Sequence, residues 1–133
     1  MGLDTTHDCW HGPYGAFSRW RNAIAEAAGY EVGPTDHGTQ YLLDWDQYEW
    51  CNFQGMWQEQ PSDALLVLLV HSDCDGYLFP EHLSGVAQRL EEVLPKLSDE
   101  WTIQKTQQFI DGLHAASSQY GDEWLGEEVV GFH

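Results

Sequence analysis

Apolar side chains recur mainly at intervals of three and four residues in three stretches of this chain. The apolar positions are Phe17, Trp20, Ile24 and Ala27 in the first stretch, Leu83, Val86, Leu90, Val93 and Leu97 in the second, and Ile103, Phe109, Leu113 and Ala116 in the third. Gly29 suits the end of the first, Pro95 the end of the second, and the acidic residues 99–100 the start of the third. The pattern therefore predicts three amphipathic helices.

Shorter segments carry weaker patterns. Residues 64–70 form a continuous apolar run that fits either a buried strand or a short buried helix. Leucine outnumbers valine in this run and Asp63 suits a helix cap, so a short fourth helix is favoured. Residues 2–10 alternate in polarity and residues 128–133 are rich in valine, so we expect two strands that pair with each other. Residues 31–40 carry glycine and proline and predict a loop.

These elements predict an α+β fold, namely a mainly helical single domain over residues 1–133 with a small peripheral sheet from the N- and C-terminal strands. A chain of 133 residues, 42% of them hydrophobic, can bury a core without a disulfide or a metal. No signal-peptide pattern follows Met1, and the apolar run at 64–70 is too short to span a bilayer. We therefore expect a cytoplasmic protein whose three cysteines are free thiols.

The charge of the chain restricts its partners. Twenty-two acidic residues against five Lys and Arg give a formal net charge of −17. Such a surface repels nucleic acids and anionic membranes, so neither is an expected partner. A basic protein is an alternative partner, and one hypothesis is an acidic mimic of nucleic acid that inhibits a DNA-binding host protein. Acidity alone, however, is also typical of a merely soluble surface.

Two short motifs concentrate the reactive side chains. Residues 6–12 read THDCWHG and residues 70–76 read VHSDCDG, so each combines imidazole, carboxylate and thiol groups before a glycine. A chain that turns at such a position gathers polar side chains in one place. We therefore expect a ligand-binding site formed by His7, Trp10, His11, His71, Asp73 and Asp75.

The same motifs offer a candidate metal site. In an extended strand His7, Cys9 and His11 would point to one face, because side chains alternate. Cys74, or alternatively His71, would complete the tetrahedral nitrogen and sulfur set that zinc prefers. The spacing matches no common zinc module, so the alternative is that Cys9 is a small buried hydrophobe and the histidines bond to loop backbone.

The motifs lack a complete catalytic set. A nucleophilic cysteine needs a nearby cation to lower its pKa, whereas Asp8 beside Cys9 opposes a thiolate, as do Asp73 and Asp75 beside Cys74. The sequence therefore favours a non-enzymatic accessory protein that binds a protein or a small polar ligand. The rival hypothesis is a zinc-type hydrolase in which the strand-face ligands hold the metal and one of the second motif's aspartates is the base.

Several segments together resemble a known group of proteins. Residues 12–21 read GPYGAFSRWR, residues 28–30 read AGY, residues 71–76 read HSDCDG and the chain ends in VGFH. This combination resembles small uncharacterised proteins of bacteriophages and mobile elements, including integron-cassette products. Gly131 replaces the acidic residue that usually precedes the final Phe-His pair. The resemblance implies a mobile-element setting, and because the family has no established activity it implies no catalytic residues.

Overall fold

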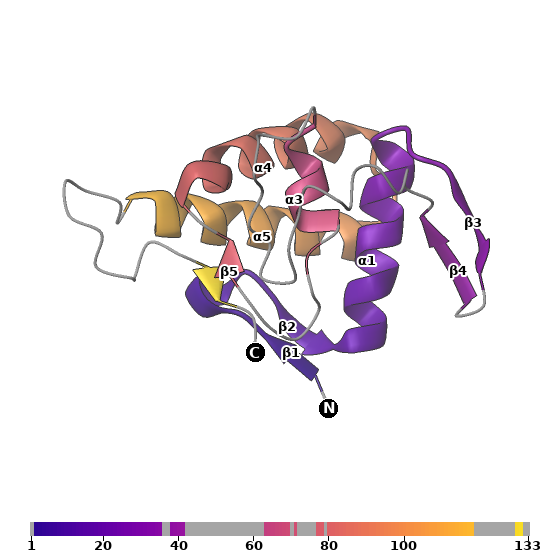
Figure 1. The fold of residues 1–133 in the computed structure, drawn as a ribbon, viewed down its shortest axis with the longest axis horizontal. Coiled ribbons are helices and arrows are strands. Elements are labelled where there is room, and N and C mark those ends of the chain that lie inside the picture. Colours follow the sequence, from indigo (N-terminus) through magenta and orange to yellow (C-terminus); the bar gives the residue numbers. More distant parts are fainter. Residues whose placement is uncertain are drawn as a thin grey trace.

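Helices make up most of the described chain, and short two-stranded sheets lie at their edges (Figure 1). The computed structural model describes residues 2–35, 38–41, 63–69, 71, 77–78, 80–118 and 130–131. The helices are α1 (Tyr14–Ala27), α3 (Leu65–Leu69), α4 (Pro80–Val93) and α5 (Glu100–Ser118), with 3-10 turns η1 (Thr6–Asp8) and η2 (Leu94–Lys96). The strands are β1 (Gly2–Asp4), β2 (His11–Pro13), β3 (Val32–Thr35), β4 (Gly38–Tyr41), β5 (Tyr77–Leu78) and β6 (Val130–Gly131). The mainly helical α+β fold predicted from the sequence is confirmed.

The first helix, α1, buries the apolar stripe that predicted it. Phe17, Trp20 and Ile24 are fully buried in the core. The chain leaves the helix at Gly29, whose φ of 98° lies in the region that strains a residue with a side chain. The backbone N–H of Gly29 donates to the carbonyl of Glu26 at 3.0 Å, as is usual at a glycine-ended helix.

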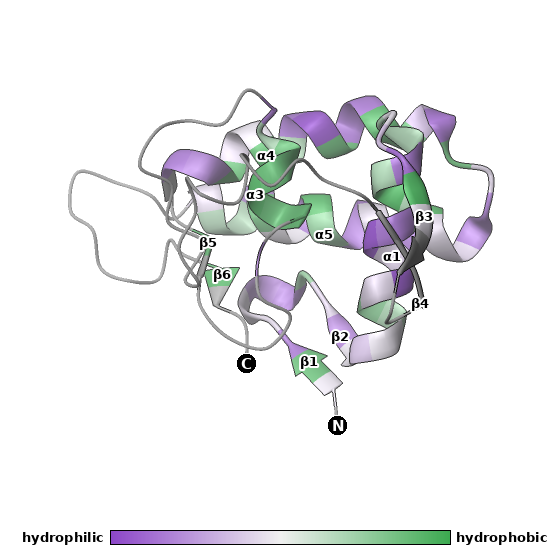
Figure 2. Ribbon diagram, turned by 45° about the vertical axis from the view of Figure 1, so that its right-hand side comes forward, coloured by the Kyte–Doolittle hydropathy of each residue, from purple (hydrophilic) through white to green (hydrophobic). Residues whose placement is uncertain are grey.

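The remaining helices pack around α5. α4 lies beside α5, connected to it through η2, and the short helix α3 packs against α4 (Figure 1). α3 is hydrophobic throughout, whereas the longer helices alternate between hydrophobic and hydrophilic residues (Figure 2). Asp63 caps α3 by accepting a hydrogen bond from the N–H of Leu65 at 3.0 Å, so the predicted cap and helix are confirmed. None of the helices in the described residues has the length and apolar character that a membrane crossing requires.

One polar connection crosses the apolar interface between α1 and α5. The indole Nε1 of Trp20 donates to Thr106 Oγ1 at 3.0 Å, and this hydroxyl donates to the carbonyl of Thr102 at 2.7 Å. The Trp20 ring stacks on Phe109 with a centroid separation of 4.9 Å. The buried indole N–H is therefore satisfied without an opening to solvent.

The loop predicted for residues 31–40 is wrong, because this segment contributes to an antiparallel ribbon. β3 pairs with β4 from Val32 opposite Tyr41 to Thr35 opposite Gly38. Pro34 lies within β3, and a two-stranded ribbon tolerates it because each strand has a free edge where a missing N–H breaks no bond. Contacts with α1 support the ribbon, and this tertiary support is not visible in a local pattern.

The predicted pairing of the two terminal strands is also wrong in detail. β1 pairs with β2, with Leu3 opposite Gly12, whereas β6 pairs with β5, with Leu78 opposite Val130. The reason is that η1 reverses the chain directly after β1 and returns β2 alongside it. β6 nevertheless contacts η1, so the N- and C-terminal segments are neighbours without sharing a sheet (Figure 1).

Candidate functional site

The first motif folds into the tight turn η1. His7 has φ of 61° and Asp8 has φ of 56°, so two consecutive residues with side chains occupy the left-handed region. Each such residue costs on the order of 1–3 kcal/mol when the surroundings impose it. Thr5 and Trp10 brace the turn, because Thr5 N donates to the Trp10 carbonyl at 3.0 Å and Trp10 N donates to Thr5 Oγ1 at 2.8 Å. Strained backbone of this kind clusters at functional sites, which makes the turn a candidate.

The middle of α5 holds the turn in place. Gln108 Nε2 donates to the carbonyl of Asp8 at 2.9 Å. Gly112 supplies the space, because a β-carbon at this position would overlap Cys9 Sγ and lie 2.8 Å from the carbonyl oxygen of His7. A glycine inside a helix lowers helix stability by about 1 kcal/mol relative to alanine. At Gly112 the close approach of the turn explains it.

A groove of about 440 Å³, which we call the turn groove, lies between η1 and α5. Its lining consists of His7, Asp8, Gln104, Gln107, Gln108, Asp111 and Gly112. Gln107 Nε2 donates to Asp111 Oδ1 at 3.0 Å, and Gln108 Nε2 donates to the turn. The carboxylates of Asp8 and Asp111 only accept hydrogen bonds, whereas each glutamine offers both an oxygen and an N–H, so the charged groups of the turn groove are acceptors.

His11 lies next to the turn groove between two carboxylates. Its Nδ1 is 2.9 Å from Asp4 Oδ1 and its Nε2 is 3.0 Å from Asp8 Oδ1. Hydrogen bonds to Asp4 and, second, to Asp8 raise the pKa of His11 above its ordinary value. The side chain is 46% exposed, and both ring nitrogens are engaged. In this state His11 fixes the orientation of Asp8 and has no free nitrogen for a metal.

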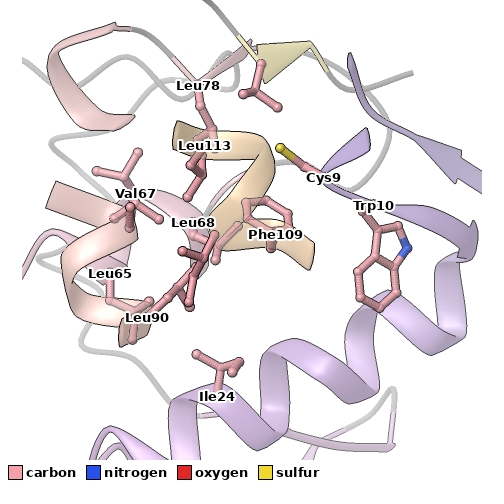
Figure 3. Packing of buried hydrophobic residues seen from close by; sticks show 14 of the residues in the cluster. Cys9, Trp10, Ile24, Leu65, Val67, Leu68, Leu78, Leu90, Phe109 and Leu113 are labelled. Atoms are coloured by element: carbon pink, nitrogen blue, oxygen red, sulfur yellow. The ribbon is translucent and has the colours of Figure 1, made fainter. Parts of the chain in front are cut away.

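Cys9 belongs to the hydrophobic core. The residue is fully buried, and its sulfur points toward α5 on the side of Leu113 (Figure 3). Burial raises the pKa of Cys9 to about 12, and the neighbouring Asp8 adds to the shift against a hydrogen bond with Thr5. The thiol is therefore protonated at neutral pH, which makes it a poor nucleophile and a poor metal ligand. Cys9 therefore fits the alternative interpretation given for it, that of a small buried hydrophobic residue.

Trp10 is likewise a packing residue, although we expected it to contact a ligand. It is fully buried, with its ring centroid 5.1 Å from that of Phe17 and 5.1 Å from that of Trp20. Its nitrogen edge is turned away from Cys9 and Phe109 (Figure 3). The expected role of Trp10 in the ligand-binding site is therefore corrected to one in the core.

The strand face predicted for His7, Cys9 and His11 is not formed. Side chains alternate only along an extended strand, and the left-handed residues of η1 break the alternation, so that Cys9 points inward while His11 is exposed. Within the described ranges no three His, Cys, Asp or Glu side chains form a group that could hold a metal ion. Cys74, the proposed fourth ligand, lies outside the described residues.

His71 is the one residue of the second motif that the structure describes. His71 is buried, and its carbonyl accepts a hydrogen bond from Arg21 Nη1 at 2.6 Å. The same Nη1 donates to the carbonyl of Leu68 at 3.1 Å, and the guanidinium lies 4.5 Å from the Phe17 ring centroid. Arg21 is therefore a positioning residue for the start of the motif. The expected ligand-binding residues Asp73 and Asp75 lie outside the described residues.

The C-terminal strand connects the neighbourhoods of the two motifs. β6 pairs with β5, which follows the second motif in sequence, and it also contacts η1 in the first motif. The turn of the first motif and the strand after the second motif thus both contact β6. Their direct contact through residues 72–76 stays a prediction.

The residues of α5 that line the turn groove were not predicted from the sequence. Gln104, Gln107, Gln108 and Asp111 read as the solvated face of an amphipathic helix. Only Gly112 gave a signal, because an isolated glycine inside a strong helical pattern indicates a close approach of another segment. The partner of that approach is about 100 residues away in sequence and follows no local rule.

No protein-family model, curated protein or solved structure matches this chain. The resemblance to proteins of phages and mobile elements therefore stays a prediction. The geometry and chemistry of the described residues are the basis on which a function is proposed.

Proposed function

We propose that this protein is a non-enzymatic accessory protein of a mobile element that binds a polar, donor-rich ligand in the turn groove. The observation that carries the proposal is the position of His7 and Asp8, which have left-handed backbone conformations and also line the turn groove. Backbone strain held in place by Gln108 and Gly112 is typical of a preorganised binding site. The mobile-element setting depends on the sequence resemblance alone.

Binding is favoured over catalysis because the groups next to the turn groove supply neither an activated nucleophile nor a free general base. Cys9 is buried and protonated, and it is therefore no nucleophile. His11 has both ring nitrogens within 3.0 Å of carboxylates and is therefore not free to act as a general base. The hydrolase rival loses the strand-face ligands on which it depends.

The chemistry of the turn groove favours a ligand that carries ammonium, guanidinium or hydroxyl groups. The side chain of Asp8 is 92% exposed at its rim, and Asp111 is exposed on the α5 side. One N–H of each carboxamide of Gln107 and Gln108 already donates to a protein oxygen, so each side chain offers its oxygen and one remaining N–H to a ligand. The net charge of −17 adds a long-range attraction for a cation.

The proposal is tested by NMR titration with agmatine, which offers an ammonium and a guanidinium, against succinate, which offers only acceptors. We expect agmatine, and not succinate, to shift the backbone amide signals of His7, Asp8 and Gly112. Asp8→Asn should weaken agmatine binding by about twofold to fivefold, the effect of losing one exposed ion pair. Glu91→Gln removes an exposed carboxylate that pairs with His114 on another face and serves as the matched control.

Two results would count against the proposal. The first is an unchanged set of amide signals in the turn and in the middle of α5 at saturating agmatine. The second is an equal loss of affinity in Asp8→Asn and Glu91→Gln, which would indicate attraction by net charge without a site. Stoichiometric zinc in protein purified without an affinity tag would instead favour the hydrolase rival.

A further inference from the structure

The few basic side chains of this acidic chain differ in how far they are bound by other groups of the protein. The chain has five Lys and Arg residues: Arg19, Arg21, Arg89, Lys96 and Lys105. Arg21 is buried against backbone carbonyls, and Arg89 pairs with Asp63 at 2.8 Å and with Glu92 at 2.6 Å. The charged groups of Arg21 and Arg89 are therefore already bound within the fold. Arg19 and Lys105 have a different environment.

Arg19 and Lys105 lie over tryptophan rings. The guanidinium carbon of Arg19 is 5.7 Å from the centroid of Trp101, and Lys105 Nζ is 4.8 Å from the centroid of Trp10. Neither forms an ion pair with a carboxylate in the described residues, although the chain has 22 acidic residues. Trp101 is 37% exposed and is the large hydrophobic side chain that the described surface leaves open.

The exposed ring of Trp101 packs against the buried aromatic cluster. Trp101 meets Trp10 edge to face, with a centroid separation of 6.2 Å and an interplanar angle of 88°. Trp10 is in turn packed against the buried rings of Phe17 and Trp20. Trp and Arg are among the residue types most enriched at the positions that dominate binding energy at protein interfaces. Little side-chain freedom remains to be lost on binding.

We propose that Arg19, Trp101 and Lys105 form a docking surface for a protein partner whose docking segment places a carboxylate beside an apolar side chain. The carboxylate accepts hydrogen bonds from the guanidinium fork of Arg19 and attracts the ammonium of Lys105. The apolar side chain covers the exposed part of Trp101. This surface selects the opposite charge from the turn groove, with which it shares α5, and it does not depend on the function proposed for that groove.

Charge complementarity favours an acidic and apolar peptide segment over other occupants. Two cations can neutralise one or two carboxylates, whereas a nucleic acid brings a long row of phosphates that the net charge of −17 repels. A second copy of the chain brings the same net charge and is repelled in the same way. A local cluster of two cations and one ring therefore matches a short segment best.

The test uses NMR of the full chain with a capped peptide in which glutamate alternates with leucine. Work at physiological ionic strength, where the Debye length is about 8 Å, screens the distant acidic residues. We expect saturable shifts of the Trp101 indole N–H signal and the Arg19 Nε–H signal. Trp101→Ser should weaken binding about tenfold. The Arg19→Gln, Lys105→Gln double variant should weaken it by about fivefold or more.

Three controls keep the test specific. Lys96→Gln removes an exposed cation elsewhere and should leave the affinity unchanged, as should Glu91→Gln, which removes an exposed carboxylate that pairs with His114. A peptide in which lysine replaces glutamate should bind at least fivefold more weakly to this surface, the loss of about one ion pair. The buried Trp20 indole N–H signal must stay in place in every variant, which shows that the core is intact.

Several results would overturn the proposal. These are unchanged Trp101 and Arg19 signals at saturating peptide, equal binding of the lysine peptide, or an unchanged affinity in the double variant. Tighter binding of single-stranded oligothymidylate than of the glutamate peptide would assign the surface to nucleic acid instead. Self-association in sedimentation experiments that Trp101→Ser abolishes would assign it to a second copy.

Discussion

The sulfur of Cys9 occupies the space that a side chain at Gly112 would need, because a β-carbon built on Gly112 would overlap it. The carbonyl oxygen of His7 would lie 2.8 Å from the same β-carbon. The sulfur is enclosed by the core and the carbonyl belongs to strained backbone, so neither neighbour can move aside at small cost. The contact between the turn and α5 therefore requires glycine at this position.

Gly112→Ala should lower the free energy of unfolding by about 1–3 kcal/mol, the usual effect of overpacking a closed site. The loss should appear even though alanine favours a helix by about 1 kcal/mol. Gly15→Ala in α1 is the matched control, because its β-carbon would meet nothing within 4 Å. Urea unfolding of both variants measures the difference. A Gly112→Ala protein as stable as the parent would show that the turn does not press on α5.

His11 should titrate above its ordinary pKa of 6.5 in an NMR pH titration, because Asp4 and Asp8 stabilise the protonated ring. Asp4→Asn should bring this pKa down further than Asp8→Asn does. Buried His82 on α4 is the internal reference, since desolvation lowers the pKa of its ring. A titration of His11 below that of His82 would contradict the bridge.

The same bridge predicts a pH dependence of stability. A folded pKa above the unfolded value means that the contribution of protonated His11 is complete below about pH 6.5 and is lost as the pH rises through the folded pKa. The groups are exposed, so the contribution is about 0.2–1 kcal/mol. Urea unfolding of the parent and of His11→Gln on both sides of this range should show that the parent loses more stability than the variant as the pH rises.

Cys9 should resist alkylation by iodoacetamide at pH 8 in the folded protein, because the thiol is buried and its pKa is raised to about 12. In urea the same cysteine should react readily, and mass spectrometry of the peptide that contains residue 9 distinguishes the two states. Rapid modification of Cys9 in the native protein would place the thiol at the surface. It would also reopen the metal hypothesis.

Arg21→Met should lower the free energy of unfolding by about 2–3 kcal/mol, because the carbonyls of Leu68 and His71 lose a charged donor inside the protein. Arg19→Met, two residues earlier on the exposed face of α1, should change stability by less than about 0.5 kcal/mol. Chemical unfolding compares the two, and hydrogen exchange should show faster opening around α3 in the Arg21 variant alone. Equal changes in the unfolding free energy of the two variants would mean that the hydrogen bonds from Arg21 to the carbonyls of Leu68 and His71 do not stabilise the fold.

The helices were predictable because their information is local. The stripe from Phe17 to Ile24, the cap at Asp63 and the glycine at the end of α1 each act within a few residues, and all three have the predicted roles. The strand partners were not predictable in the same way. β1 could pair with any available edge, and the choice of β2 depends on the left-handed residues in η1.

The candidate site was predictable only in part. The first motif does mark it, since His7, Asp8 and His11 lie in or beside the turn groove. The sequence could not show that Cys9 and Trp10 point inward. The prediction assumed that side chains alternate between two faces along residues 5–11, whereas His7 and Asp8 form a left-handed turn, a conformation that these residue types can adopt without glycine. The contribution of α5 comes from the far end of the chain, where no local pattern names a partner.

The hydroxyl of Thr106 fixes which turn of α5 faces α1. The hydroxyl accepts a hydrogen bond from the Trp20 indole and donates one to the carbonyl of Thr102, so it acts as both acceptor and donor within the otherwise apolar interface between α1 and α5. Two helices joined by apolar contacts alone can shift by one turn of about 5.4 Å and repack. Here the same shift would leave the buried indole N–H of Trp20 without a hydrogen-bond acceptor. The hydrogen bond of Thr106 thus favours the observed alignment of α1 and α5, and an isosteric Thr106→Val protein would lose this preference while keeping the apolar contacts.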